Sequence, residues 1–474
     1  MLTWRNHTGN QICHPERIVA PGSLQDLIDI VLSAEAKNTT VRAVGTGHSW
    51  SEAALTDGYL VEPGNLVGTR LPTDEPLKPA AQALPLVRVL GGTPIRSLNF
   101  DLDGMDLALT NMGGYDAQTI AGVVSTSTHG SGLSFPPFPD MVRSLDLVIS
   151  GGAALRLEPA DGPTDPDAFE HDKLTLLQDT EKFRAAICGI GTLGLIHSLL
   201  LEVREKFWLN EVRTLSTWEA ERDALSADGV LGQGDHYELF VNPYPQSDER
   251  HRALVTRRRE CPEPHELPED KLERHPLTEL ESSLLITGTV LRFLARHLPK
   301  LMTKRFDAVL AEMCDDGYAN LSYRVFNIGE ANKLPAYSME LGVAVDGRHV
   351  TAVDRILEIA QTQATKGLYH SSPFSLRFVA PSQACASMMC DQPTMMIELI
   401  MVADGSNKGF ELLKGYEADL KDLDIRPHWG QYNPGLTPAR IAELYPQWWK
   451  WLAVEAEFNE SGVFNSAFTA RIGA

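Results

Sequence analysis

Residues 40–49 have the sequence Thr40-Val-Arg-Ala-Val-Gly-Thr-Gly-His-Ser49, in which a short alternating strand ends at two closely spaced glycines. Glycine lets the backbone turn tightly, and in such a turn successive N–H groups can point at one anion. A diphosphate can be held in this way without cationic side chains. Taken alone, the pattern is more typical of a surface turn that carries a histidine.

Secondary-structure signals on both sides of this turn indicate a mixed α/β unit. Ser23 is a good N-cap for a helix with apolar residues on one face, because its side chain can accept a hydrogen bond from the first turn. Strand-like segments lie at 86–90, at 144–150 and within 188–203, and a helix is expected from 95 to 102. We expect this unit to end near residue 205.

A second stretch rich in glycine and hydroxyl side chains lies at residues 109–132. It contains Thr126-Ser-Thr-His-Gly-Ser-Gly132, which again allows close backbone approach to a polar ligand. Neither stretch is a GxGxxG dinucleotide fingerprint, and the sequence has no Walker motif or HExxH. Either stretch could be an ordinary loop, but the two together favour a large nucleotide ligand.

Composition limits the class of protein and its partners. The chain has 474 residues, of which 43% are hydrophobic and 22% charged, as is typical of a soluble globular protein with two domains. A net charge of −21 disfavours nucleic acid and anionic membrane surfaces. The sequence contains no apolar run long enough for a membrane span and no secretory signal at its start. We therefore expect a cytoplasmic enzyme, either a monomer or a homodimer.

The six cysteines show neither zinc-ligand spacing nor a CxxC pair. Cys13 precedes His14, but no further ligands stand nearby in the sequence. We interpret the cysteines as reduced structural thiols and expect no metal site.

The second half of the chain differs in composition and in its pattern of apolar residues. Residues 246–282 are charged and rich in proline, and Arg257-Arg-Arg-Glu260 is interpreted as a solvated run. A helix with apolar residues around much of its circumference is expected within 286–305, either as a core or cap helix or as a surface for a membrane or a second subunit. Strand-like segments at 337–345, 374–380 and 394–402 predict a second sheet.

The order of several short motifs resembles one group of flavoproteins. Besides the two glycine-rich stretches, the chain carries Ile18-Val-Ala-Pro-Gly-Ser-Leu24, Gly191-Thr-Leu-Gly-Leu-Ile196 and Arg426-Pro-His-Trp-Gly430. This order is similar to that of the vanillyl-alcohol oxidase superfamily, and within it to the sugar-1,4-lactone and alditol oxidases. The resemblance covers about residues 10–205 and 425–470 well, and the middle of the chain loosely.

The resemblance implies an α+β fold with an FAD-binding domain and a cap. Residues 1–205 would form the FAD-binding domain from two small α/β subdomains. Residues 206–425 would form a substrate-binding cap with an antiparallel sheet flanked by helices. Residues 426–474 would then return to the FAD-binding domain.

The resemblance also assigns cofactor contacts. In relatives, the histidine of the Gly-His-Ser motif is bonded to the flavin 8α-methyl carbon, which implies a covalent link at His48. No cysteine lies in 109–132, so a second link is not expected. The implied FAD contacts are Ala43, Val44, Gly45, Thr46, Gly47, His48, Ser49, Gly113, Gly114, Thr119, Gly122, Thr126, Ser127, Thr128, His129 and Ile196. In relatives, the residue after the Asn-Met pair shields the flavin from oxygen when it is large, so Gly113 implies an oxidase.

On the substrate side the chain departs from the pattern of its relatives. Their Glu-x-Arg is replaced by Ser375-Leu-Arg377, and their His-Trp-Gly-Lys by His428-Trp-Gly-Gln431. Glu398 stands near the position of a histidine in alditol oxidases, and Gly114 replaces a serine that touches the polyol. Because a site that hydrogen-bonds hydroxyl groups discriminates strongly, these changes should alter the substrate.

The expected catalytic residues are Arg377, Glu398, Gln431, Ser375 and His428. Without the resemblance, Arg377 would be interpreted as a surface arginine on a strand. Alternation places Ser375 and Arg377 on one face of their strand, and Glu398 can meet them from a second strand. An acid in an apolar strand has its pKa raised by desolvation, which suits a general base or a partner for a cationic substrate group.

Three functions remain open at this point. The first is an FAD-dependent oxidase of a sugar lactone or alditol that passes electrons to oxygen and gives hydrogen peroxide. The second is an oxidase of a bulkier alcohol, such as a sterol or a secondary metabolite. The third is a flavin-binding protein without turnover.

Overall fold

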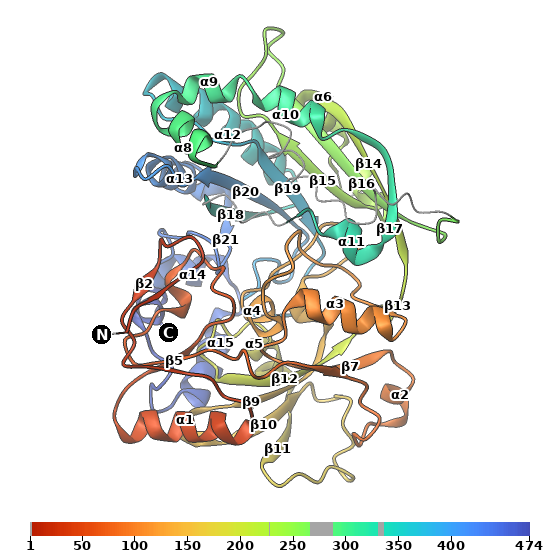
Figure 1. Cartoon of the computed structure of the whole chain (residues 1–474), viewed down its shortest axis with the longest axis vertical. Helices are drawn as coiled ribbons and strands as arrows, with labels where there is room; N and C mark the ends of the chain where they lie inside the picture. Colours follow the sequence, from red (N-terminus) through yellow and green to blue (C-terminus); the bar gives the residue numbers. More distant parts are fainter. Residues whose placement is uncertain (1, 227, 266–287, 330–335) are drawn as a thin grey trace.

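The computed structural model describes residues 2–226, 228–265, 288–329 and 336–474. Its elements form two halves stacked along the long axis of the molecule (Figure 1). The lower half holds two sheets built before residue 205 together with the C-terminal helices, and the upper half is built on one large sheet. This arrangement confirms the expected α+β fold with an FAD-type half and a cap.

The smaller sheet of the lower half is parallel, in the order β3-β5-β4. Its strands are β3 (Arg17–Val19), β5 (Tyr59–Val61) and β4 (Val41–Ala43), and α1 (Leu24–Ala36) connects β3 to β4. Ser23 caps α1 as expected, accepting a hydrogen bond from the Asp26 N–H at 3.1 Å. The glycine turn at 45–49 follows β4 directly.

The second sheet of the lower half has six strands in the order β11-β10-β9-β12-β7-β6. These strands are β11 (Leu174–Gln178), β10 (Ala154–Glu158), β9 (Val142–Val148), β12 (Leu195–Glu202), β7 (Leu86–Leu90) and β6 (Thr69–Arg70). The helices of this part are α2 (Pro79–Gln82), α3 (Ile95–Gly104), α4 (Ile120–Ser125) and α5 (Thr180–Ala186). Two short ribbons, β1 (Trp4–Arg5) with β2 (Ile12–Cys13) and β8 (Leu107–Ala108) with β13 (Arg204–Glu205), complete it.

The upper half contains an antiparallel sheet in the order β17-β14-β16-β15-β19-β20-β18-β21. Its strands are β17 (Asp315–Leu321), β14 (Trp208–Thr217), β16 (Arg252–Cys261), β15 (His236–Val241), β19 (Phe374–Val379), β20 (Thr394–Val402), β18 (Ala336–Ala344) and β21 (Arg426–Pro427). The strands expected at 337–345, 374–380 and 394–402 are therefore central strands of one sheet.

Side-chain alternation gives this large sheet two contrasting faces. Apolar side chains such as Leu376 and Ile397 pack against α12 (Arg348–Thr365) and α13 (Lys408–Asp419). Neighbouring residues in the same strands, Arg377 and Glu398, point to the opposite face. The charged face is thus turned away from α12 and α13, and the apolar core on the other side anchors its strands.

The last helices of the chain pack against elements of the lower half. After β21 it forms α14 (Pro438–Leu444), α15 (Trp448–Phe458) and α16 (Ala467–Ile472). Trp451 donates to the Cys188 carbonyl oxygen at 3.1 Å, and the Val41 N–H donates to the Val463 carbonyl oxygen at 2.7 Å. Because β21 still belongs to the upper sheet, the boundary placed before residue 426 stays a prediction, as does the one after residue 205.

The helix expected within 286–305 is divided in two. α8 (Gly288–His297) ends before Leu298, and α9 (Pro299–Thr303) begins at a proline, which cannot continue the hydrogen-bond ladder of a preceding helix. Residues 286 and 287, and residues 266–282 of the charged stretch, lie outside the described residues. No helix among the described residues is long and apolar enough to cross a membrane.

The remaining helices among the described residues of the upper half are short. They are α6 (Trp218–Glu221), α10 (Phe306–Glu312) and α11 (Ser322–Phe326). All six cysteines lie within the described residues and are free.

Candidate active site

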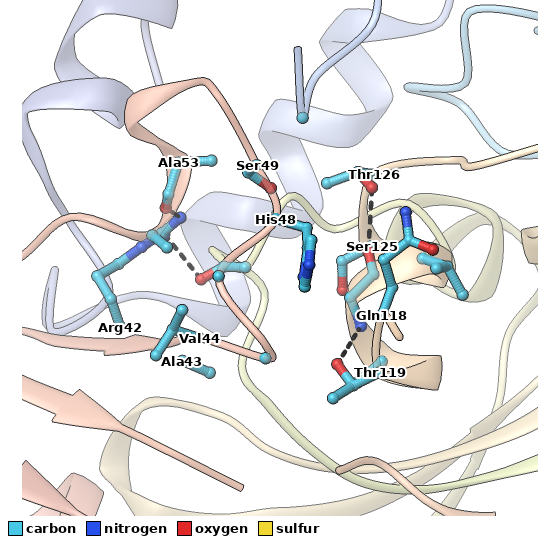
Figure 2. Close-up of a pocket in the computed structure, with 18 of the residues that line it drawn as sticks. Arg42, Ala43, Val44, His48, Ser49, Ala53, Gln118, Thr119, Ser125 and Thr126 are labelled. Atoms are coloured by element: carbon cyan, nitrogen blue, oxygen red, sulfur yellow. Dashed lines mark hydrogen bonds between the residues drawn. The ribbon is translucent and has the colours of Figure 1, made fainter. Parts of the chain in front are cut away.

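The turn after β4 lines a large cavity (Figure 2). Three chain segments form its walls, from residues 42–55, 118–128 and 190–196, and a fourth contribution comes from His428, Gly430 and Gln431. The expected cofactor residues that line it are Ala43, Val44, Gly45, Thr46, Gly47, His48, Ser49, Thr119, Gly122, Thr126, Thr128 and Ile196.

The glycine turn presents free backbone donors to this cavity. Among the described residues, no acceptor receives a hydrogen bond from the backbone N–H groups of residues 45–49. Gly47 has φ +72°, a conformation that glycine adopts without strain. A Cβ atom on Gly45 would collide with the Thr119 hydroxyl. The turn therefore fits the diphosphate of FAD, which needs several N–H donors and close backbone approach.

A buried arginine fixes the base of the turn. The Arg42 guanidinium donates to the carbonyl oxygens of Gly191 at 2.8 Å, Ile190 at 2.9 Å and Phe464 at 3.2 Å, and also to that of Ala53. Burial lowers the pKa of Arg42 to about 10, so the guanidinium stays charged at neutral pH. It therefore ties the turn to the segment at 190–191 and to the C-terminal part of the chain.

His48 projects into the cavity between the turn and the segment at 118–126 (Figure 2). Its Nδ1 lies 2.8 Å from the Thr46 hydroxyl and its Nε2 lies 2.9 Å from the Tyr115 hydroxyl. The His7 ring stacks on it at 4.7 Å. Burial, followed by the charges of His7 and Arg96, lowers the pKa of His48 to about 4. At neutral pH the imidazole is uncharged, so one ring nitrogen keeps a lone pair.

The turn at residues 126–129 sends alternate side chains to opposite sides. Thr126 and Thr128 line the cavity. Ser127, at φ +56°, is fully buried, and its hydroxyl lies 2.7 Å from that of Ser387. His129 points toward Glu340. Among the expected FAD contacts, the structure therefore directs the side chains of Ser127 and His129 away from this cavity.

A second, smaller cavity lies between the Gly113–Gly114 region and the charged face of the large sheet. A Cβ atom on Gly113 would lie 3.3 Å from the His129 carbonyl oxygen and 3.7 Å from Thr128. Gly114 lines the smaller cavity, whose other residues are Met112, Gly130, Ser131, His236, Glu238, Arg258, Phe326, Ile328 and Arg377. This cavity has one charged wall and one apolar wall.

The structure brings the expected catalytic residues of β19 and β20 together. Ser375 and Glu398 are direct partners across these strands. Glu398 accepts hydrogen bonds from Arg377 at 3.3 Å and from the Ser375 hydroxyl at 3.4 Å. Gln431 donates to it at 3.5 Å and also lines the large cavity. Gln431 therefore connects the two sites, and His428 lines the large cavity beside it.

Arg377 is shared by three carboxylates on this face. Its Nε donates to Glu238 at 3.0 Å, and its Nη1 lies 3.3 Å from Glu398 and 3.9 Å from Glu340. Burial alone would lower the pKa of Arg377, but these three acids raise it. Burial raises the pKa of Glu398, with Glu340 and Glu238 acting in the same direction and Arg377 against them.

The interpretation of Arg257-Arg-Arg-Glu260 as a solvated run is wrong for Arg258. This side chain is buried and donates to Glu211 at 2.8 Å and to Glu238 at 3.1 Å. Alternation along β16 turns Arg258 inward, while Arg259 stays exposed and pairs with Asp235.

Several residues of the site had no assigned role in the sequence analysis. They are Arg42, Tyr115, Glu238, Arg258 and Glu340. For the two acids a signal existed, since each interrupts an apolar strand in the same way as Glu398 does. For Tyr115 and Arg42 the sequence held no such signal, because their partners lie far away along the chain.

Comparison with known protein families supports a flavoenzyme. The model of an FAD binding domain matches residues 15–158, and that of the D-arabinono-1,4-lactone oxidase family matches residues 201–472. The chain is therefore an FAD-dependent oxidoreductase. Because the second match spans more than half of the chain, the chain belongs to the D-arabinono-1,4-lactone oxidase family. The resemblance to the vanillyl-alcohol oxidase superfamily is thereby confirmed.

Individual relatives share modest identity over nearly the whole chain. An L-gulono-1,4-lactone dehydrogenase of Mycobacterium tuberculosis is 28% identical, covering 99% of this chain and 98% of its own. An L-gulonolactone oxidase of Mus musculus is 23% identical, and the match covers 97% of this chain and 96% of that protein. A long-chain alcohol oxidase of an uncultured marine euryarchaeote is 26% identical, with 99% and 96% covered. The structure of a cholesterol oxidase from B. sterolicum has the same fold, with a TM-score of 0.74 and 14% identity. The superposition covers 99% of this chain and 96% of that one.

The fit of Gly45 against Thr119 gives a direct test of the FAD cavity. In Gly45→Ala the added methyl group would collide with the Thr119 hydroxyl. Overpacking costs about 1–3 kcal/mol, so the affinity for FAD should fall roughly ten- to a hundredfold. The measurement is the flavin content of the purified protein together with FAD titration into the apoprotein. Gly64→Ala, where a Cβ atom meets nothing within 4 Å, is the matched control. Equal FAD affinity in both variants would contradict the assignment.

Proposed function

We propose that this protein oxidises a hydroxyl-bearing carbon of an aldono-1,4-lactone or a related sugar alcohol and reduces oxygen to hydrogen peroxide. The observation that carries the proposal is the group of Arg377, Glu398, Ser375 and Gln431, which joins a hydrogen-bonding site to the FAD cavity. Membership of the D-arabinono-1,4-lactone oxidase family supports the substrate class.

The reaction needs a hydride acceptor and a base. The cavity lined by the turn at 45–49 and the segment at 118–128 would hold FAD, which when bound would supply the acceptor for the hydride that leaves the substrate carbon with both electrons of the C–H bond. Glu398 takes the hydroxyl proton, and a carbonyl group forms in the substrate. Arg377 holds the substrate oxygen while negative charge develops on it, since a guanidinium stays charged at any working pH. Ser375 and Gln431 orient the substrate by hydrogen bonds.

The Ser375–Glu398 pair offers an explanation for the missing Glu-x-Arg motif. Where relatives place a carboxylate two residues before the arginine, this chain has Ser375, whose direct partner on β20 is Glu398. The carboxylate still contacts Arg377, at 3.3 Å, but from the neighbouring strand. A carboxylate beside the arginine is thus retained in space although its position in the sequence has changed.

A second substrate class is favoured by the apolar wall of the smaller cavity. Met112, Phe326 and Ile328 form this wall, and Ile328 fills the space where a side chain on Gly114 would lie. Such an apolar wall would contact the hydrocarbon chain of a long-chain alcohol more favourably than a fully hydroxylated polyol. The similarity to a long-chain alcohol oxidase points in the same direction.

A substrate panel separates these functions. D-Arabinono-1,4-lactone, L-gulono-1,4-lactone, xylitol and a series of primary alcohols are each mixed with the enzyme under air, and peroxide release is measured. We expect saturable peroxide release with a lactone. Saturation only with long-chain alcohols would favour the second class. A flavin that none of these compounds reduces would overturn the proposed oxidase function.

The covalent link at His48 is a proposal supported by the neutral imidazole in the cavity. Because an uncharged nitrogen can form a bond to the flavin, acid-precipitated protein should stay yellow, and flavin fluorescence should run with the chain on a denaturing gel. His48→Ala should release all flavin, whereas the exposed His14→Ala should retain it. Complete release of flavin from the wild-type protein would contradict the link.

Oxygen as the electron acceptor rests on Gly113. In Gly113→Val the new side chain would crowd the His129 carbonyl oxygen and Thr128, beside the FAD cavity. We expect reoxidation of the reduced flavin by oxygen to slow at least several-fold, while reduction by substrate changes much less. Stopped-flow absorbance of the two half-reactions measures this, with Gly104→Val as the control because its Cβ position is open. An unchanged reoxidation rate would contradict the role of Gly113.

The roles of Arg377 and Glu398 predict different defects. Arg377→Ala removes a donor to developing negative charge and should slow anaerobic flavin reduction by about a hundredfold or more. In the wild type the rate should fall as the pH falls through the raised pKa of Glu398, because protonated Glu398 cannot accept a proton. Glu398→Gln should be slow at every pH and lack this acidic limb.

Arg348→Ala is the control for the arginine variant, because the partly exposed Arg348 pairs with Asp346 and Asp424 far from the charged face. All variants should retain flavin. Near wild-type reduction rates in both Arg377→Ala and Glu398→Gln would place the catalytic groups elsewhere.

A further inference from the structure

One buried histidine of the smaller cavity has a ring nitrogen without a partner. His236 lies on β15, and alternation places it on the charged face together with Glu238, two residues later. It is only 4% exposed and lines the smaller cavity. Its Nδ1 lies 2.8 Å from the Ser131 carbonyl oxygen, and no described residue forms a hydrogen bond with its Nε2.

The Ser131 carbonyl decides which nitrogen of His236 carries the proton. A carbonyl oxygen can only accept, so Nδ1 is the donor in this hydrogen bond. Burial lowers the pKa of His236 to about 4, although the hydrogen bond with Ser131 acts in the opposite direction. At neutral pH the ring is therefore uncharged, and Nε2 keeps a lone pair that can accept a hydrogen bond.

Two aromatic rings fix the plane of this imidazole. Phe135 stacks on it with a centroid distance of 4.0 Å and an angle of 4° between the rings. Phe326 meets it edge-on at 4.8 Å. Because this packing and the Nδ1 hydrogen bond both restrict rotation, the ring cannot turn Nε2 toward another protein group without losing them.

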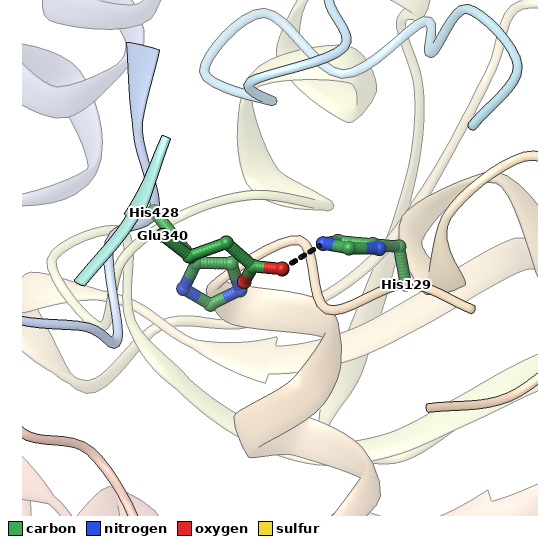
Figure 3. A group of neighbouring side chains, drawn as sticks. All are labelled: His129, Glu340 and His428. Carbon is green, nitrogen blue, oxygen red and sulfur yellow. Dashed lines mark ion pairs between the residues drawn. The ribbon is translucent and has the colours of Figure 1, made fainter. Parts of the chain in front are cut away.

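Three other buried side chains of this region contact one another instead. His129 Nε2 lies 3.3 Å from a Glu340 carboxylate oxygen, and His428 lies beside them (Figure 3). One nitrogen or oxygen atom of each lies within 4.8 Å of the others. None of these three is among the residues that line the smaller cavity. Among the residues that line it, His236 is the histidine that offers a free nitrogen to a bound molecule.

A hydrogen-bond donor lies next to this acceptor. Arg258 is the direct partner of His236 across β15 and β16, and it also lines the smaller cavity. Its Nε donates to Glu211 at 2.8 Å and its Nη1 to Glu238 at 3.1 Å. No described residue accepts a hydrogen bond from its Nη2. Since the Cβ atoms of direct partners lie about 5 Å apart, the cavity has an acceptor and a donor side by side.

A hydroxyl group is the chemical group that satisfies both of these partners. It can donate its hydrogen to His236 Nε2 and accept a hydrogen bond from Arg258 Nη2. A carboxylate has no hydrogen for His236, and an ammonium group would be repelled by the charge of Arg258. A hydrocarbon chain would leave both polar atoms buried and unpaired, which is unfavourable.

The position of this pair sets its distance from the reacting carbon. Glu238 is the direct partner of Arg377 across β15 and β19, so His236, two residues earlier, is a diagonal neighbour of Arg377. Diagonal neighbours in an antiparallel pair lie about 7–8 Å apart. A molecule of the size of a sugar lactone can therefore contact Arg377 with one oxygen and His236 with another.

We propose that His236 and Arg258 bind a second hydroxyl group of the substrate while the carbon being oxidised lies at Arg377 and Glu398. His236 accepts a hydrogen bond from this hydroxyl group, and Arg258 donates one to it. The inference rests on the proposed function and narrows its substrate class to alcohols with several hydroxyl groups, as in an aldono-1,4-lactone or an alditol. An alcohol with a single hydroxyl group would leave this pair unpaired, and such a site discriminates strongly against it.

Deoxygenated ligands test this pair without any change in the protein. The 2-, 3- and 5-deoxy derivatives of D-arabinono-1,4-lactone each lack one hydroxyl group. Their dissociation constants are measured by calorimetry under anaerobic conditions with holoenzyme whose flavin is kept reduced, so that no turnover takes place. Loss of the hydroxyl group that contacts His236 should weaken binding about tenfold to a hundredfold. Equal affinity for the parent lactone and all three derivatives would overturn the proposal.

A variant of His236 assigns the effect to this residue. His236→Phe keeps a ring that can stack on Phe135 and removes both nitrogens. The parent lactone should bind to it about tenfold or more weakly, and one deoxy derivative should bind as tightly as the parent, because the group that distinguished them is gone. His236→Leu serves the same purpose if the phenylalanine variant does not fold.

His349→Phe is the matched control. His349 is also buried and bonds to a backbone carbonyl, that of Leu225, but it lies on α12 on the other side of the sheet. This variant should keep the wild-type preference for the parent lactone over each derivative. A His236 variant that keeps that preference as well would overturn the proposal.

Failure of this inference differs from failure of the proposed function. Lactones that reduce the flavin without any dependence of binding on His236 would overturn the inference and leave the oxidase function standing. The same holds if long-chain alcohols reduce the flavin while neither the lactone nor xylitol binds to the reduced enzyme.

Discussion

The Arg377 guanidinium lies among three buried carboxylates. The architecture of the upper half follows from the need to hold these four charged groups in contact with one another. Removing charges from water is costly, and an ion pair offsets the cost only with good geometry. Here the geometry comes from strands fixed by an apolar core on the other face, where Leu376 and Ile397 pack under α12 and α13. The same strands thus carry a hydrophobic core on one side and a reactive set of charges on the other.

The charged face also depends on the lower half, and the dependence runs through two short segments. The segment after β21 carries His428 and Gln431, which line the FAD cavity while Gln431 contacts Glu398. The turn after α4 lines that cavity with Thr126 and Thr128 and sends His129 to Glu340. In the proposed mechanism, the hydride leaves the substrate carbon toward the flavin, and the proton leaves its hydroxyl group toward Glu398. These segments give the two halves of the molecule a common boundary where both transfers can take place.

Local chemistry could be predicted from the sequence, whereas pairings over long distances could not. The turn at 45–49 and its place after a strand followed from glycine spacing, and β20 has the predicted bounds 394–402. The meeting of Ser375 and Glu398 followed from alternation in two strands. Which strands are neighbours was beyond the sequence, since β15 pairs with β19 more than a hundred residues later.

Glu238, Arg258 and Glu340 therefore received no role, and Arg258 was placed in solvent. The direction of the His129 side chain depends on the turn that contains Ser127 at φ +56°, which residue types alone do not reveal.

The central claim is that hydride leaves the hydroxyl-bearing carbon of the substrate while an ionised carboxylate takes the proton. Anaerobic flavin reduction by D-arabinono-1,4-lactone, unlabelled or with deuterium on the reacting carbon, measures both parts when it is followed against pH. The account predicts that deuterium slows reduction by a similar factor at every pH, while the rate itself falls below the pKa of Glu398. Reduction that is insensitive to deuterium and independent of pH would contradict it.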